Sequence, residues 1–111
     1  MRNRLYRYSA VLLLGALLAA CSKVPDGILS EKKMQAVQVD MQLAEAMINL
    51  DSKAFSDNAR KEALYQSIFR KYDITQAEYD SSLIWYARNL DISLKVYDRV
   101  LADLNKRQKA L

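Results

Sequence analysis

The side chains of this 111-residue chain offer little catalytic chemistry. It contains no histidine, which is the commonest general base and the commonest transition-metal ligand. Asp80, Ser81 and Ser82 bring a carboxylate and two hydroxyls together, and a lysine could activate such a serine. No glycine-rich turn or oxyanion-forming loop accompanies them, and the carboxylates of Asp98 and Asp103 fall on different faces of a charged segment. We therefore expect no enzyme, no cofactor and no metal site.

The only cysteine, Cys21, follows a segment with the composition of an export signal. Residues 1–7 carry three arginines and no acid, and residues 9–20 carry no charge. This apolar run is too short to span a bilayer, which takes about 20 residues, but it suits a signal peptide. Two alanines directly precede the cysteine, as at a small-residue cleavage site. We predict a cleaved signal peptide over residues 1–20.

The four residues Leu18-Ala19-Ala20-Cys21 resemble a bacterial lipobox. The resemblance implies a diacylglyceryl group on the Cys21 sulfur, cleavage before this residue and acylation of the new amine. Several acyl chains at one site anchor a protein stably, whereas one chain binds only marginally. The alternative is an ordinary signal peptide followed by a chance cysteine. We expect lipidation at Cys21, with the membrane as the first partner.

The charge balance changes once the leader is set aside. The whole chain has 17 basic and 13 acidic residues, and three of the basic ones lie in the leader, which leaves 14 against 13. A nearly neutral exported domain gives no reason to expect a nucleic-acid partner. Residues 21–111 suffice for one domain with a modest core.

Residues 21–29 are predicted to be a short lipidated tether, since they hold the only proline and one of the two glycines. A tether of this length keeps the domain close to the bilayer. Ser22 stands where an aspartate would, in some bacteria, imply retention in the inner membrane, and no acidic cluster follows it. We therefore expect an outer-membrane protein that faces the periplasm.

Apolar residues recur at helical spacing in four segments, and none of the chain after the leader alternates with the period of a strand. The first segment has two apolar stripes and a narrow polar face, so it should lie centrally. The predicted helices run from Ser30, as cap, to about Leu50, from Asn58 to Tyr72, from Gln76 to about Arg88 and from Ile92 to about Arg107.

The start of each later helix has its own capping signal. Ser56 or Asp57 precedes the second helix, Thr75 and Glu78 form a capping box before the third, and Asp91 precedes the fourth. Short connections favour antiparallel neighbours, so residues 30–111 are predicted to form an all-α bundle of about four helices. One bent helix through Asp73 is the alternative for the second and third, because no glycine or proline separates them.

Several short motifs of the mature chain occur together in one family. They are Val24-Pro25, Glu31 to Met34, Asp40 with Ala44-Glu45-Ala46, Phe69 to Tyr72, Ile74-Thr75, the run YDSSLIWYARN from Tyr79 to Asn89, and Val96-Tyr97. With them the chain resembles the small lipoproteins of Bacteroidetes grouped as domain of unknown function 4296. It departs from the family at Asp73, where the resemblance implies a glycine that would accept a left-handed backbone without penalty. The resemblance implies a fold and a location but no activity.

Asp40 is the one carboxylate within the apolar arc of the first helix. An isolated buried charge is too costly, so it must be paired or hydrogen-bonded, and the partners we expect are tyrosine hydroxyls, the Ser82 hydroxyl and Arg88. Such acids often lie at functional sites as well as in structural networks. Asp40, Ser82, Tyr86 and Arg88 are therefore the candidate polar network or binding site.

Trp85 lies about 100° around its helix from the face of Tyr86, so we expect it to be partly exposed. It either packs over a neighbouring helix end or anchors a partner, since tryptophan is enriched at interface hot spots.

Two functions fit these observations. The first is a non-catalytic helical interaction or scaffold module that docks onto another envelope protein. The second is a small-ligand-binding lipoprotein with an aromatic cleft between the first and third helices. A pocket of a few hundred cubic ångströms with convergent polar groups would favour the ligand binder, and a shallow exposed apolar surface would favour the module.

Overall fold

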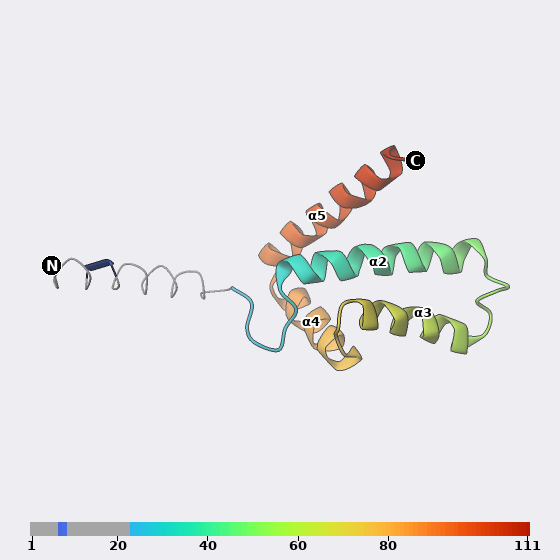
Figure 1. The fold of residues 1–111 in the computed structure, drawn as a ribbon, viewed down its shortest axis with the longest axis horizontal. Helices are drawn as coiled ribbons and strands as arrows, with labels where there is room; N and C mark the ends of the chain where they lie inside the picture. Colours follow the sequence, from blue (N-terminus) through green and yellow to red (C-terminus); the bar gives the residue numbers. More distant parts are fainter. Residues whose placement is uncertain (1–6, 9–22) are drawn as a thin grey trace.

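Four α-helices make up the fold in a computed structural model that describes residues 7–8 and 23–111. Residues 23–111 contain no strand, so the predicted all-α bundle of about four helices is confirmed. The helices are α2 (Glu31–Leu50), α3 (Asn58–Lys71), α4 (Gln76–Arg88) and α5 (Leu90–Lys109) (Figure 1).

Three of the four predicted helix starts are confirmed by their capping bonds. The Ser30 hydroxyl accepts from the Lys33 amide at 3.2 Å, and the Asp57 carboxylate accepts from the Ala59 amide at 2.9 Å. Thr75 and the acid three residues later form the full capping box. These signals lie within one turn of sequence, so they act without the rest of the fold.

The cap predicted at Asp91 is wrong. Asn89 alone connects α4 to α5, so α5 begins at Leu90 and Asp91 lies inside its first turn. The Asn89 side chain does not cap α5 but donates back to the Trp85 carbonyl at 2.8 Å. The Asp91 carboxylate still interacts favourably with the positive end of the helix dipole, which is why the sequence resembles a capped start.

The turn between α3 and α4 closes with a left-handed residue. The Ile74 amide donates to the Phe69 carbonyl at 3.0 Å and the Asp73 amide donates to the Arg70 carbonyl at 3.2 Å, the two bonds of a Schellman motif. Asp73 has φ +52°, and the side chains of Ile74 and Phe69 are buried beside it. The chain therefore makes two helices here, and the alternative of one bent helix is wrong.

The long helix α2 lies at the centre, as its two apolar stripes predict. It packs against α3 on one side and α5 on another, and α4 packs against α5. Figure 1 shows α2 and α3 antiparallel, with α5 leaving α2 at an angle toward the C-terminus. Val39 is fully buried, whereas Leu43, Met47 and Leu50, farther along the same stripe, are exposed. The divergence of α5 therefore leaves the far half of that stripe uncovered.

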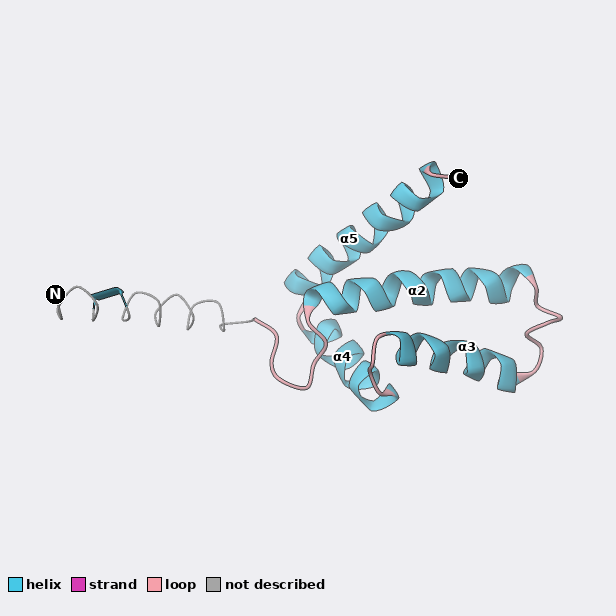
Figure 2. Cartoon of the chain, viewed as in Figure 1, coloured by secondary structure: helices cyan, strands magenta, loops and turns pink. Residues whose placement is uncertain are grey.

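The segment before α2 belongs to the packed body. Val24 and Leu29, both within the predicted tether, are buried in the same core as the helices. Gly27 takes φ +84°, and the Ile28 amide donates to the Pro25 carbonyl at 3.3 Å, which turns the chain back toward α2. This loop runs beside the end of α4 and the start of α5 (Figure 2). Among residues 23–111, the packed core therefore includes Val24 and Leu29, which precede α2.

Candidate functional site

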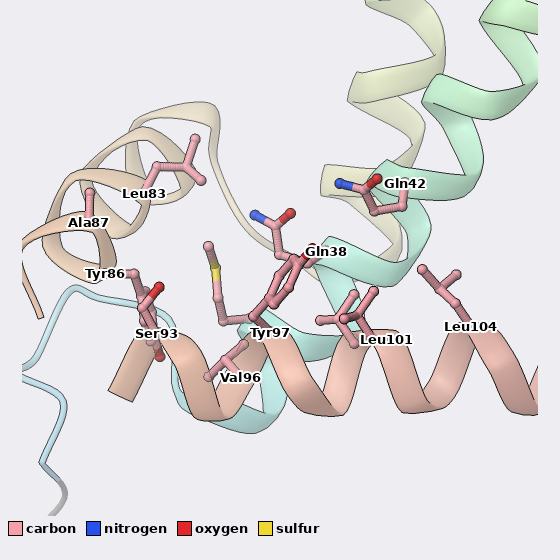
Figure 3. A pocket seen from close by; sticks show the side chains of 12 residues that line it. Gln38, Gln42, Leu83, Tyr86, Ala87, Ser93, Val96, Tyr97, Leu101 and Leu104 are labelled. Carbon is pink, nitrogen blue, oxygen red and sulfur yellow. The ribbon is translucent and has the colours of Figure 1, made fainter. Parts of the chain in front are cut away.

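An apolar groove of about 320 Å³ lies between α2, α4 and α5. Helix α5 supplies its floor, α4 one wall and α2 the other (Figure 3). We call it the apolar groove, and its lining consists of Met34, Gln38, Gln42, Leu83, Tyr86, Ala87, Ser93, Val96, Tyr97, Val100, Leu101 and Leu104.

The groove is open because the apolar residues of α5 divide between two directions. Val96 and Val100 are buried against the core. Tyr97 and Leu101 instead rise from α5 toward the space between α4 and α2, where they remain 57% and 42% exposed (Figure 3). Leu83 on the α4 wall is also exposed. Contiguous exposed apolar side chains of this kind mark interaction surfaces in soluble domains.

Few polar groups are available inside the groove. The Gln38 amide donates to the Tyr79 hydroxyl at 3.1 Å, and the Tyr86 hydroxyl donates to the Leu29 carbonyl at 2.8 Å. Gln42, Ser93 and the hydroxyl of Tyr97 are the polar lining groups for which the described residues provide no hydrogen bond. A specific polar ligand would need several convergent groups, so the lining suits an apolar surface better.

Asp40 has partners, as its position in the apolar arc requires. One carboxylate oxygen accepts from the Lys71 ammonium at 2.7 Å and from the Tyr72 hydroxyl at 2.8 Å. The hydrogen bond to Asp40 raises the pKa of Lys71, and burial, followed by the same carboxylate, raises the pKa of Tyr72. A tyrosine is thus a partner as expected, whereas the expected contacts with Ser82 and Arg88 are wrong. This network joins α2 to the end of α3 and does not line the apolar groove.

Ser82 and Tyr86 act on the segment before α2 instead. The buried Ser82 hydroxyl accepts from the Leu29 amide at 2.9 Å and donates to the Glu78 carbonyl at 2.6 Å. The Tyr86 hydroxyl donates to the Leu29 carbonyl, so α4 binds both the amide and the carbonyl of Leu29. Burial, with the nearby charge of Glu31, raises the pKa of Tyr86 to about 12. The hydroxyls of Ser82 and Tyr86 therefore both hold the segment before α2 against α4.

The structure separates the remaining candidates from the groove. Arg88 is exposed at the end of α4, and no hydrogen bond or ion pair joins it to the described residues. Trp85 is half-buried, packs against the core and lies edge-on to Tyr86 with ring centroids 5.0 Å apart. Trp85 does not line the apolar groove, so its role as a partner anchor remains a hypothesis.

A second hollow of about 490 Å³ lies between α2, α3 and α4 and is more polar. Tyr65, Phe69 and Tyr79 form an aromatic part of its lining, and Glu45 and Asp80 lie at its edge. Burial raises the pKa of Tyr79, the bond from Gln38 opposes this, and the charges of Glu45 and Asp80 add to it. In the part of the chain that the structure describes, no cluster of acids and cysteines is arranged to hold a metal ion.

The sequence profile of the domain of unknown function DUF4296 matches residues 25–110. The chain belongs to this family. Membership in this domain family, which the short motifs predict, is therefore confirmed, whereas the lipoprotein character and the bacterial group stay predictions. Neither the curated proteins nor the solved structures gave a match.

The DUF4296 match begins at the turn that leads into the core and ends at the last turn of α5. It therefore includes every residue of the apolar groove and of the Asp40 network. Cys21 and the predicted signal peptide precede it, and apart from residues 7–8 they lie outside the described residues. None of the described helices has the length and apolar character to cross a bilayer.

Sequence reasoning missed two exposed residues at the start of α5 of the DUF4296 domain. The sequence pattern places Leu90 in the connection before the fourth predicted helix. Leu94 falls outside the apolar arc that the spacing predicts for that helix, which consists of Val96, Tyr97, Val100, Leu101 and Leu104. Both are strongly exposed in the structure. A heptad count from Leu90 would have found them, because Tyr97 and Leu101 continue the same spacing.

Proposed function

We propose that this DUF4296 protein is a non-catalytic, lipid-anchored module of the cell envelope that docks another envelope protein in its apolar groove. The observation that supports the proposal is the set of exposed apolar side chains on the α5 floor and the α4 wall, above all Tyr97, Leu101 and Leu83. Removal of such side chains from water is the dominant favourable term in most protein–protein association.

The polar groups of the domain support a binding role over catalysis. Asp40, Ser82 and Tyr86 are each occupied in bonds that join one helix or segment to another. Ser81 and Asp80 have no basic partner among the described residues. A nucleophile needs such a base to be activated.

The anchor at Cys21 is supported by the lipobox resemblance and by the early start of packing. Val24 is buried and lies three positions after the predicted lipid attachment at Cys21. An extended chain of this length reaches only about 10 Å. The groove would then stay near the membrane, within reach of a membrane-bound partner. On the sequence argument above, this membrane is the outer membrane and the domain faces the periplasm.

Site-specific photocross-linking in cells tests the docking role. A photoreactive phenylalanine analogue replaces Leu101 in the groove, and the matched control replaces Lys106, an exposed residue on the same helix. We expect a discrete protein adduct from the first position that is absent from the second. A further substitution of Leu83→Glu should abolish the adduct. Identical adducts at both positions, or none at either, would contradict the proposal.

A small apolar ligand is the second candidate, and the groove volume of about 320 Å³ favours it. This lies at the lower end of the range for ligand sites, about 300–1,000 Å³. Native mass spectrometry of the full-length protein, extracted gently from membranes, would show such a ligand as a discrete added mass. The added mass should disappear with Leu101→Glu if the groove holds it.

A further inference from the structure

A continuous apolar stripe runs along the open side of α5. Leu90, Leu94, Tyr97, Leu101 and Leu104 follow one another at spacings of four, three, four and three residues. Leu90 and Leu94 are 66% and 60% exposed, so the described helices do not cover the N-terminal end of the stripe. A mean spacing of 3.5 residues is the period of a coiled-coil seam, in contrast to the wider arc of an ordinary core-facing helix.

We infer that this stripe is a docking seam for one amphipathic α-helix of a partner protein, and that this helix carries lysine or arginine beside its apolar residues. The inference rests on the proposed docking function and names the kind of partner. The stripe is about 21 Å long at 1.5 Å per residue, so it would take a helix of about four turns.

The walls of the groove suit a helix more than a flat surface. Figure 3 shows Leu83 on α4 and Gln42 on α2 on opposite sides of the α5 side chains Tyr97 and Leu101. A helix laid along the stripe would contact α5 below and the two walls beside it. Short helices are marginal alone and gain stability mainly by packing an apolar face, which the three-sided site provides.

The charge along the stripe selects the partner. Asp91 and Asp98 are exposed and lie on the same edge of the stripe, and the described residues pair neither with a base. The other acids of this region are occupied, since Asp103 pairs with Arg107 at 3.0 Å and Glu31 with Arg99 at 3.7 Å. The opposite edge, along Ser93 and α2, carries amides and a hydroxyl. Lys95 lies one turn from both carboxylates and pairs with neither, so this edge keeps a net negative charge. Residues beside a coiled-coil seam set partner choice through charge, so basic residues on the partner complement this edge.

Two other occupants fit this edge less well. A second copy packed antiparallel on the stripe would place Asp98 close to its own symmetry mate, and like charges there are unfavourable. The exposed carboxylates of Asp91 and Asp98 would repel an anionic bilayer surface. The sedimentation measurement below tests the second copy, and the neutral nanodiscs keep an anionic bilayer out of the binding assay.

The test uses the full-length protein in neutral phosphatidylcholine nanodiscs and two labelled helical peptides of about three heptads. Both peptides carry leucine along the seam, and they differ only in having lysine or glutamate beside it. Fluorescence anisotropy reports binding, with empty nanodiscs as the blank. We expect micromolar binding of the lysine peptide and at least about tenfold weaker binding of the glutamate peptide.

Three variants locate the site. Leu94→Glu should weaken lysine-peptide binding by at least about tenfold. Ile84→Glu is the matched control, because Ile84 is similarly exposed but lies on α4, outside the α5 stripe, and binding should not change. Asp98→Lys should shift the preference toward the glutamate peptide. Circular dichroism confirms that each variant is folded.

Several outcomes would overturn the inference. Equal binding of both peptides removes the charge argument, and binding that survives Leu94→Glu places the site elsewhere. Sedimentation of a dimer that Leu101→Glu dissociates would make a second copy the occupant. If neither peptide binds a folded protein while the photocross-link at Leu101 still forms, the helical partner is wrong and the docking function stands.

Discussion

Replacing Asp40 by alanine should destabilise the domain by about 2–3 kcal/mol. The side chain of Asp40 is 13% exposed, whereas that of Lys71 is 62% exposed. The ion pair is therefore largely screened by solvent and contributes little to stability. The hydrogen bond from Tyr72 to a charged acceptor contributes more, about 1.5–3 kcal/mol. The total lies below the roughly 3–5 kcal/mol lost on breaking a fully buried ion pair.

The loss is limited because Tyr72 keeps a second acceptor. Its hydroxyl also lies 3.3 Å from the Ala36 carbonyl, so removal of the carboxylate does not leave a buried donor without a partner. Asp40→Asn retains an oxygen acceptor for Tyr72 and should cost about half as much. Added salt should weaken only the Lys71 contribution.

Urea melts followed by circular dichroism measure these differences. A double-mutant cycle of Asp40→Ala with Tyr72→Phe should give a larger coupling energy than the cycle with Lys71→Met. An Asp40→Ala protein that melts like the parent would refute the reasoning, since the carboxylate would then contribute nothing. A coupling to Lys71 that exceeds the coupling to Tyr72 would show that the screening argument is wrong.

Four further predictions concern other parts of the chain. Asp73→Gly should stabilise the domain by about 0.5–1 kcal/mol, because glycine accepts φ +52° without strain, and thermal melts with Asp73→Ala as control will show it. Tyr86 stabilises the fold while neutral, so stability should fall as pH rises from its ordinary pKa near 10 to about 12, and this alkaline loss should shrink in Tyr86→Phe. Trp85→Ala should cost about 3 kcal/mol through lost packing on Tyr86, and a parent-like melt would instead favour the partner-anchor hypothesis. Cys21→Ser should abolish labelling by a radioactive fatty acid, and label retained on the variant would exclude the lipid anchor.

The features that the sequence predicted well are those fixed by neighbouring residues. Helix starts at Ser30, Asp57 and Thr75 depend on bonds within one turn, and the buried stripe of α2 from Met34 to Ala44 depends on spacing alone. The prediction of Asp91 as a helix cap was wrong because a carboxylate is favourable near the positive end of the helix dipole both as a cap and inside the first turn. A single-residue connection at Asn89 has no sequence signal that distinguishes it from a longer one.

The candidate site was predicted only in part, because it depends on how helices cross. The sequence required a partner for Asp40 but could not name Lys71, which lies 31 residues away. It placed Tyr97 and Leu101 on an apolar face without showing that this face is open. Tertiary packing decides whether α5 lies along α2 or diverges from it. The groove between α2, α4 and α5 depends on this crossing and therefore could not be predicted from the sequence.

The hold of α4 on Leu29 has a mechanical consequence. The Ser82 hydroxyl binds the Leu29 amide and the Tyr86 hydroxyl binds the Leu29 carbonyl, while Val24 is buried upstream. Tension applied to the chain before Val24 must therefore break packing and two buried hydrogen bonds before it can peel α2 from its N-terminal end. The two hydrogen bonds transmit this force to α4. The domain should therefore resist pulling at its N-terminus better than pulling at its C-terminus, because the C-terminal end of α5 diverges from α2 (Figure 1).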